Sequence, residues 1–202
     1  MDAETYPSSW LVFLAQLPSK PSSARVALWR RMRAAGATPL VNGAWMLPRT
    51  TAHEDFFEQS RQGAIRQGGT GFVLRASGSS PESNESIVRL FQSDRSREYS
   101  EFAERCAAFL NEINRESAAE KYTFAEMEES EQDLKKLARW LAKIQARDFF
   151  PNGDRDQSVA LLAQCRRALR GFSQAVYKVE GVHGPAAGWD HPITLVPKPE
   201  ER

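Results

Sequence analysis

Residues that build metal and redox sites are scarce in this sequence. Its 202 residues include two cysteines, Cys106 and Cys165, and three histidines, with no CxxC pair. Two of the histidines, His183 and His191, lie in a stretch rich in Pro and Gly near the end of the chain. The motifs GxSxG, HExxH and a P-loop lysine are also missing. The sequence therefore predicts no catalytic residues, no metal site, no cofactor and no enzymatic activity.

Long hydrophobic runs are absent too. The most apolar stretch is Trp10–Leu17, far shorter than the roughly 20 residues that a membrane-spanning helix needs. The first nine residues contain two acids and neither Lys nor Arg, whereas a secretory signal begins with basic residues. Two cysteines outside any metal or redox motif suit a reducing compartment. We therefore expect a cytoplasmic protein with two buried thiols.

The charge of the chain changes sign along its length, although the net charge is only +1. Residues 1–81 carry +4, residues 82–135 carry −7 and residues 136–202 carry +4. Such a chain can present a basic face to a polyanion. Alternatively, the blocks neutralise one another within the fold, and we prefer this interpretation when charge is the only observation.

Strand and helix patterns alternate over residues 8–76. The sequence predicts strands at 10–17, 40–41, 44–47 and 71–75, with an Asn42-Gly43 hairpin between the second and third. Helices are expected at 24–35, ending at Gly36, and at 51–67. Their inward residues would be Val26, Leu28, Trp29 and Met32 in the first and Phe56, Phe57, Ser60, Ala64 and Ile65 in the second. This order predicts a ferredoxin-like βαββαβ sandwich.

The rest of the sequence predicts helices. A polar stretch, 77–86, would connect the sandwich to an antiparallel helical bundle over 86–179, followed by a flexible tail over 180–202. Thr123 opens a capping box. The fold class is thus α+β. Three apolar seams would form the bundle core: Tyr99, Phe102, Cys106, Phe109, Leu110 and Ile113; Met127, Leu134, Leu137, Leu141 and Ile144; and Val159, Leu162, Cys165, Leu169, Phe172 and Val176.

Two groups of basic residues are candidate binding sites. The first falls within fourteen residues that contain no acid, and it can bind phosphates or form a solvated outer face. The second can hold an oxyanion through planar guanidinium groups, or it can neutralise the acidic block, which we prefer. The first group is Lys20, Arg25, Arg30, Arg31 and Arg33, and the second is Arg166, Arg167 and Arg170.

Several motifs, in order, resemble the N-terminal domain of the chromate-resistance regulator family ChrB. They are Trp10-Leu-Val-Phe-Leu14, Leu17 to Gly36, Asn42-Gly-Ala-Trp-Met-Leu-Pro48, Arg97-Glu-Tyr99, Phe124-Ala-Glu-Met-Glu128 and Arg147-Asp-Phe-Phe150. The sheet portion also resembles Cas2 nucleases and phenylacetate-pathway repressors. Cas2 nucleases have an acidic residue at the end of the first strand. The corresponding segment here, Ala15-Gln-Leu-Pro18, has none, which argues against a metal-dependent nuclease.

The resemblance implies a DNA-binding transcriptional regulator of chromate-efflux genes, with Arg25–Arg33 as the DNA contact. We expect a homodimer, because paired half-sites require one. Family members continue into a second domain associated with chromate sensing, whereas this sequence stops after a short tail. Either the sensor is a separate protein, or this protein has another role in the same pathway. The alternative is an accessory protein that binds a partner or an oxyanion such as chromate.

Overall fold

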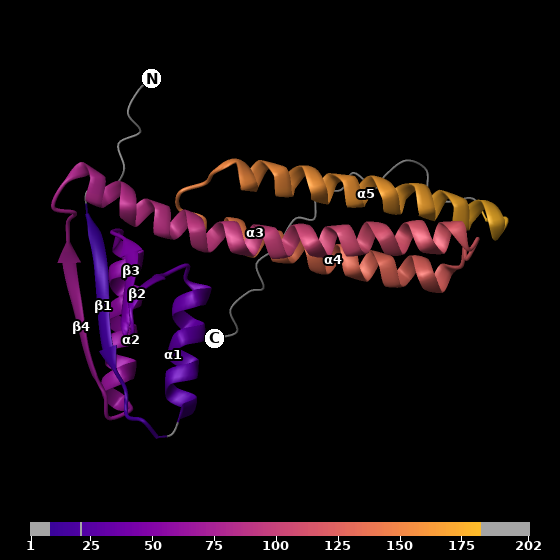
Figure 1. Ribbon diagram of the computed structural model, residues 1–202. Coiled ribbons are helices and arrows are strands. Elements are labelled where there is room, and N and C mark those ends of the chain that lie inside the picture. The colour runs from indigo at the N-terminus through magenta and orange to yellow at the C-terminus, as the bar shows by residue number, and fades with distance from the viewer. Residues whose placement is uncertain (1–8, 21, 183–202) are drawn as a thin grey trace.

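The structure is a computed structural model that describes residues 9–20 and 22–182. It confirms the α+β fold class: a four-stranded sheet with two helices is followed by three long helices (Figure 1). The elements, in chain order, are β1 (Trp10–Gln16), α1 (Ser22–Ala34), β2 (Thr38–Val41), β3 (Ala44–Pro48), α2 (Thr51–Arg66), β4 (Thr70–Ala76), α3 (Pro81–Ala118), α4 (Phe124–Gln145) and α5 (Gly153–Val179).

The sheet has the strand order β2-β3-β1-β4, and every neighbouring pair is antiparallel. With the element order βαββαβ, this is the ferredoxin-like topology that the sequence predicts. The expected hairpin joins β2 to β3 through Asn42 and Gly43, and Gly43 has a φ of +81°. Helices α1 and α2 cover one face of the sheet, where Met32 and Phe57 pack against Phe13 and Leu47.

Helix α3 links the sandwich to the bundle because its two ends pack on different partners. Near its start, Val88 and Phe91 cover Trp10 and Met46 on the other face of the sheet. The Trp10 ring stacks on Phe91 with centroids 5.7 Å apart, and its Nε1 donates a hydrogen bond to Asn84. The remainder of α3 lies in the bundle, which projects away from the sheet (Figure 1).

The bundle is an up-down-up arrangement of α3, α4 and α5. Its core consists of the predicted seams without Val159, and Phe102, Cys106, Ile144 and Val176 are fully buried. Both thiols are free and buried, as expected. Thr123 Oγ1 accepts a hydrogen bond from the backbone N–H of Glu126, which confirms the predicted helix start.

Four sequence predictions are wrong in detail. Residues 81–86 are not part of a connection, because Ser80 caps α3 and Pro81 occupies its first turn. In α1, only Met32 is buried, and Val26 and Trp29 are exposed. The predicted stripe requires α1 to pack against the sheet through a broad surface, whereas α1 buries only the part of its surface around Met32. Ile65 and Val159 also face outward, since each lies at the margin of its helix's apolar stripe.

Candidate nucleic-acid interface

Basic side chains dominate the sandwich. Residues 10–76 contain nine Lys and Arg but only three Asp and Glu, a net charge of +6. Four of the nine form ion pairs with acidic groups. The other five have no acidic partner within the part of the chain that the structure describes, and all are exposed. They are Lys20, Arg25, Arg30, Arg31 and Arg66.

Local contacts hold two of these side chains in place. Arg25 donates hydrogen bonds to the carbonyls of Pro18 (2.9 Å) and Ser19 (2.6 Å), which fixes the turn before α1. The guanidinium of Arg31 lies 5.2 Å from the centre of the Phe56 ring, a cation–π contact. No acidic residue neutralises either group, so the start of α1 and its side toward α2 attract anions.

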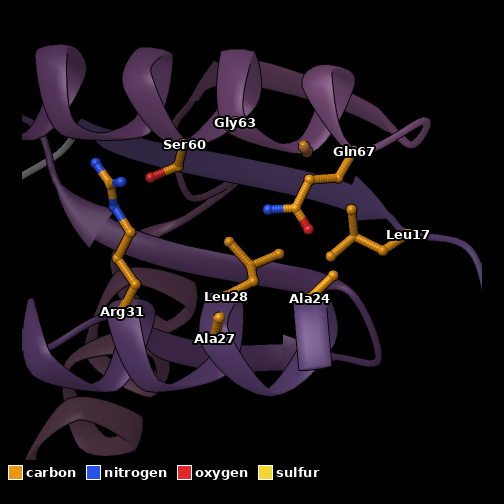
Figure 2. Close-up of a pocket in the computed structure, with 9 residues that line it drawn as sticks. Leu17, Ala24, Ala27, Leu28, Arg31, Ser60, Gly63 and Gln67 are labelled. Atoms are coloured by element: carbon orange, nitrogen blue, oxygen red, sulfur yellow. The ribbon is translucent and has the colours of Figure 1, made fainter. Parts of the chain in front are cut away.

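A groove runs between α1 and α2, and the positions of the basic groups can be described relative to its two ends (Figure 2). It has a volume of about 140 Å³, and small residues of both helices, among them Ala24, Ala27 and Gly63, line it. Arg31 lies at one end of the groove, and Gln67 and Ala24 lie on its two sides at the other end. Arg66, which precedes Gln67 in the chain, therefore sits at the same end as the start of α1. Sequence reasoning missed Arg66 because it considered only one contiguous segment.

Arg33 is placed differently from the other predicted DNA contacts. Its guanidinium bridges two acidic residues of α3, Asp94 at 3.0 Å and Glu98 at 3.4 Å. The side chain is only 26% exposed. Arg33 therefore ties α1 to α3 and is occupied by acidic partners.

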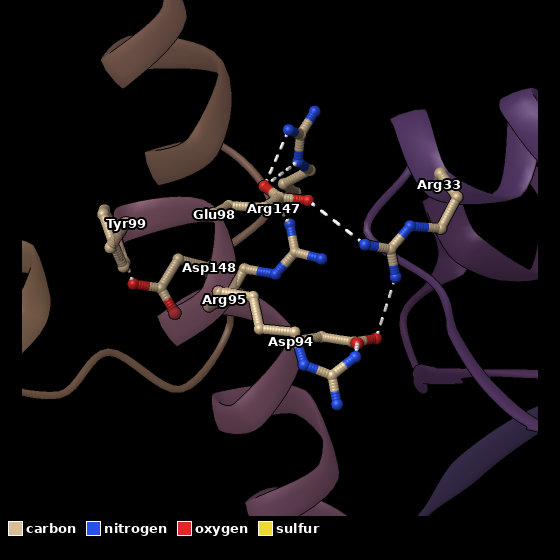
Figure 3. A network of polar contacts seen from close by, with 8 residues as sticks. Arg33, Asp94, Arg95, Glu98, Tyr99, Arg147 and Asp148 are labelled. Atoms are coloured by element: carbon tan, nitrogen blue, oxygen red, sulfur yellow. Dashed lines mark hydrogen bonds and ion pairs between the residues drawn. The ribbon is translucent and has the colours of Figure 1, made fainter. Parts of the chain in front are cut away.

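Glu98 is the centre of an ion-pair network at the junction of the sandwich and the bundle (Figure 3). Besides Arg33, it accepts hydrogen bonds from Arg95 at 2.9 Å and from Arg147 at 2.7 Å. The Arg95 side chain is 3% exposed, and its Nη2 has no hydrogen-bond partner among the described residues. Burial lowers the pKa of Arg95, while the charge of Glu98 opposes this shift.

The two motifs around residues 97–99 and 147–150 meet at this junction. Tyr99 donates a hydrogen bond to Asp148 at 2.8 Å, and burial, reinforced by this bond, raises the pKa of Tyr99. Phe149 packs edge-on against His53, and Phe150 packs against Trp10. Each residue of the second motif thus fastens the α4–α5 connection to another element. Both motifs are visible in the sequence, but their spacing along the chain does not predict that they touch.

The arginines of α5, Arg166, Arg167 and Arg170, are exposed. None of them forms an ion pair with another described residue, so the expected neutralisation of the acidic block by these arginines is not observed. Instead, apart from Asp94 and Glu98 at the junction, the acidic residues of α3 and α4 that form ion pairs do so with bases close by in sequence. Examples are Lys135 with Glu131 and Lys136 with Asp133.

Residue types with reactive or metal-binding potential are dispersed. In the described ranges, no group of three His, Cys, Asp or Glu side chains is arranged to hold a metal ion. The ring of His53 hydrogen bonds to the carbonyl of Pro48, and the predictions for His183 and His191 lie outside the described residues. A hydrogen bond with the Cys165 thiol, together with burial, raises the pKa of Cys106. Within residues 9–20 and 22–182, no helix combines the length and apolarity needed to span a bilayer.

Comparison with known proteins identifies the family of this chain. A family model described as "Protein ChrB, N-terminal" matches residues 25–183. Protein ChrB of Cupriavidus metallidurans is 27% identical over 145 residues, which cover 72% of this chain and 41% of that protein. The chain thus spans about two fifths of the length of this relative.

Proposed function

Because the chain belongs to the family defined by the N-terminal domain of ChrB, we propose that it is a cytoplasmic transcription regulator of chromate-resistance genes that binds double-stranded DNA. The observation that carries this proposal is the set of five basic side chains without acidic partners in the α1–α2 layer. Lysine and arginine contacts with phosphates release condensed counterions and supply most of the affinity of such proteins for DNA.

The structure refines the proposed contact set. Lys20, Arg25, Arg30 and Arg31 stay in it, and Arg66 joins them because the end of α2 and the start of α1 border the same end of the groove. Arg33 is left out, since Asp94 and Glu98 already hold its guanidinium. These contacts position the protein on the DNA backbone, whereas sequence is read by contacts with base edges.

A salt titration of DNA binding tests this proposal. The probe is the duplex from upstream of the protein's own gene, with a scrambled duplex for comparison, each with and without chromate. Arg30→Ala/Arg31→Ala should weaken binding to both duplexes and lower the salt slope by about 2, since each lost phosphate contact removes about 1. Arg166→Ala/Arg170→Ala makes the same change in charge on α5 and should bind normally. An unchanged affinity in the α1 double variant would overturn the assignment.

A second candidate function uses the α5 arginines. Arg166, Arg167 and Arg170 are exposed and lack ion pairs within the described chain, which favours an accessory role in binding an oxyanion. A ligand that binds only the folded protein raises its melting temperature. Chromate, with sulfate as control, should therefore raise the melting temperature of the full chain and should not raise that of Arg166→Ala/Arg170→Ala. A flat curve across the chromate titration would remove this candidate.

A further inference from the structure

One face of the sheet is only partly covered. Cross-strand pairing places Val12 beside Leu74, and Leu14 beside both Ala44 and Phe72. These residues share the face opposite to α1 and α2, because residues two apart on a strand point to the same side. Helix α3 covers this face at the Trp10 and Met46 end and leaves the other end open.

Large apolar side chains lie on the open end. Phe72 is 61% exposed, Leu74 is 48% exposed and Val41 is 70% exposed. Val41 pairs with Ala44, so Val41, Ala44, Leu14 and Phe72 form one row across all four strands. We call Val12, Leu14, Val41, Phe72 and Leu74 the open sheet face. Val41, Phe72 and Leu74 are its exposed members; Leu14 is half-buried between Val41 and Phe72, and Val12 is half-buried where α3 begins to cover the sheet. An exposed apolar patch of this kind is typical of an interaction site.

The open sheet face carries no charge. The only charged residue in the four strands is Arg75, which pairs with Leu11 on the helix-covered side and forms an ion pair with Glu54. A phosphate backbone would find no cation on this face. If this face packs against an identical uncharged face, by contrast, no like charges repel each other and no charge is buried without a partner.

We propose that the open sheet face packs against the same face of a second copy of this chain. Two-fold symmetric interfaces bring one surface patch against itself, so the patch must be compatible with its own copy. Two sheets packed face to face bury interdigitated side chains about 10 Å apart. The sheet separates this face from the α1–α2 layer, so pairing would leave Lys20, Arg30 and Arg31 accessible. This inference does not depend on DNA binding.

The test is the mass of the full chain in solution, measured by light scattering and sedimentation over a wide range of concentration. The natural chain should be a dimer. Leu74→Glu should raise the dimer dissociation constant at least about 30-fold, the size of a hot-spot substitution at an interface. Ile65→Glu is the matched control, because Ile65 on α2 is equally exposed, at 48%. It should leave the dimer intact.

Phe72→Ser gives a milder variant, which should weaken the dimer without adding a charge. Circular dichroism melting curves identify any variant that has unfolded; at exposed positions, we expect curves close to that of the natural chain. A natural chain that stays monomeric would overturn the proposal and point to a different partner. A dimer that persists in Leu74→Glu, or that Ile65→Glu dissociates equally, would place the interface on another surface.

Discussion

The sandwich and the bundle handle their charges in different ways. On α3 and α4, several acidic residues pair with bases three or four positions away on the same helix, as Glu131 does with Lys135, while Glu98 at the junction pairs with Arg147 from the α4–α5 connection. In the sandwich, Lys20, Arg25, Arg30 and Arg31 have no acidic neighbour among the described residues. Exposed ion pairs on one helix contribute little to stability, and they also neutralise the surface. The arginines of α5 also lack ion pairs among the described residues, but they lie in the region that contains the acidic block, which carries −7 over residues 82–135. The sandwich carries +6 over residues 10–76, so it is the side of the molecule that attracts a polyanion.

The two regions also differ in how their helices pack. Helices α3, α4 and α5 each face two others, so each buries a continuous apolar seam. Helix α1 has the sheet beneath it and α2 beside it, and it buries only Met32. Trp29, which is 54% exposed, remains on its outer side. The helix that contributes least to the core is thus the one that is free to contact a partner.

The largest expected effect comes from breaking the junction between the two regions. Glu98→Ala removes the ion-pair partner of Arg95, whose side chain is 3% exposed. Removing one partner of a buried ion pair costs about 3–5 kcal/mol, because the other charge is left buried. We expect a loss of this size in the free energy of unfolding, measured by denaturant titration.

Glu112→Ala is the control for this prediction, because Glu112 is an exposed acid on the same helix. It should change the free energy of unfolding by no more than about 0.5 kcal/mol. Equal effects of the two substitutions would show that the junction does not hold the regions together.

Two glycines should respond to alanine with opposite signs. Gly36 ends α1 with a φ of +79°, and a Cβ there would lie 2.6 Å from the Cβ of Arg147. Gly36→Ala should therefore destabilise the protein by about 2 kcal/mol, through an unfavourable backbone conformation and this clash. Gly171 lies within α5 with nothing near the added Cβ. Gly171→Ala should stabilise the protein by about 0.5–1 kcal/mol.

Thermal unfolding of the two variants beside the natural chain measures both changes. A neutral Gly36→Ala would mean that the segment at Arg147 can move away from α1. A destabilising Gly171→Ala would mean that a partner surface approaches α5 at this position.

Features set by neighbours in sequence could be predicted. The Asn42-Gly43 hairpin, the cap at Thr123 and the bundle seams all depend on residues within a few turns of one another. The junction could not be predicted, because Glu98 and Arg147 are 49 positions apart and Arg33 and Asp94 are 61 apart. The segment around Arg33 contains no acidic residue, so its sequence suggests that Arg33 has no ion-pair partner. In the fold, however, Asp94 and Glu98 of α3 pair with Arg33. The orientation of Trp29 was missed for the same reason, since a helical pattern does not show how broad the contact is.

Trp29 offers the smallest change in stability and the sharpest test of how α1 packs. Because its side chain is about half exposed, Trp29→Ala should lower the free energy of unfolding by less than about 1 kcal/mol. Trp45, in the same sandwich, is 7% exposed in the core, and Trp45→Ala should cost about 3–5 kcal/mol. Denaturant titration compares the two variants directly. If Trp29→Ala costs as much as Trp45→Ala, then α1 packs through the stripe that its sequence suggests, and its outer side is not available to DNA.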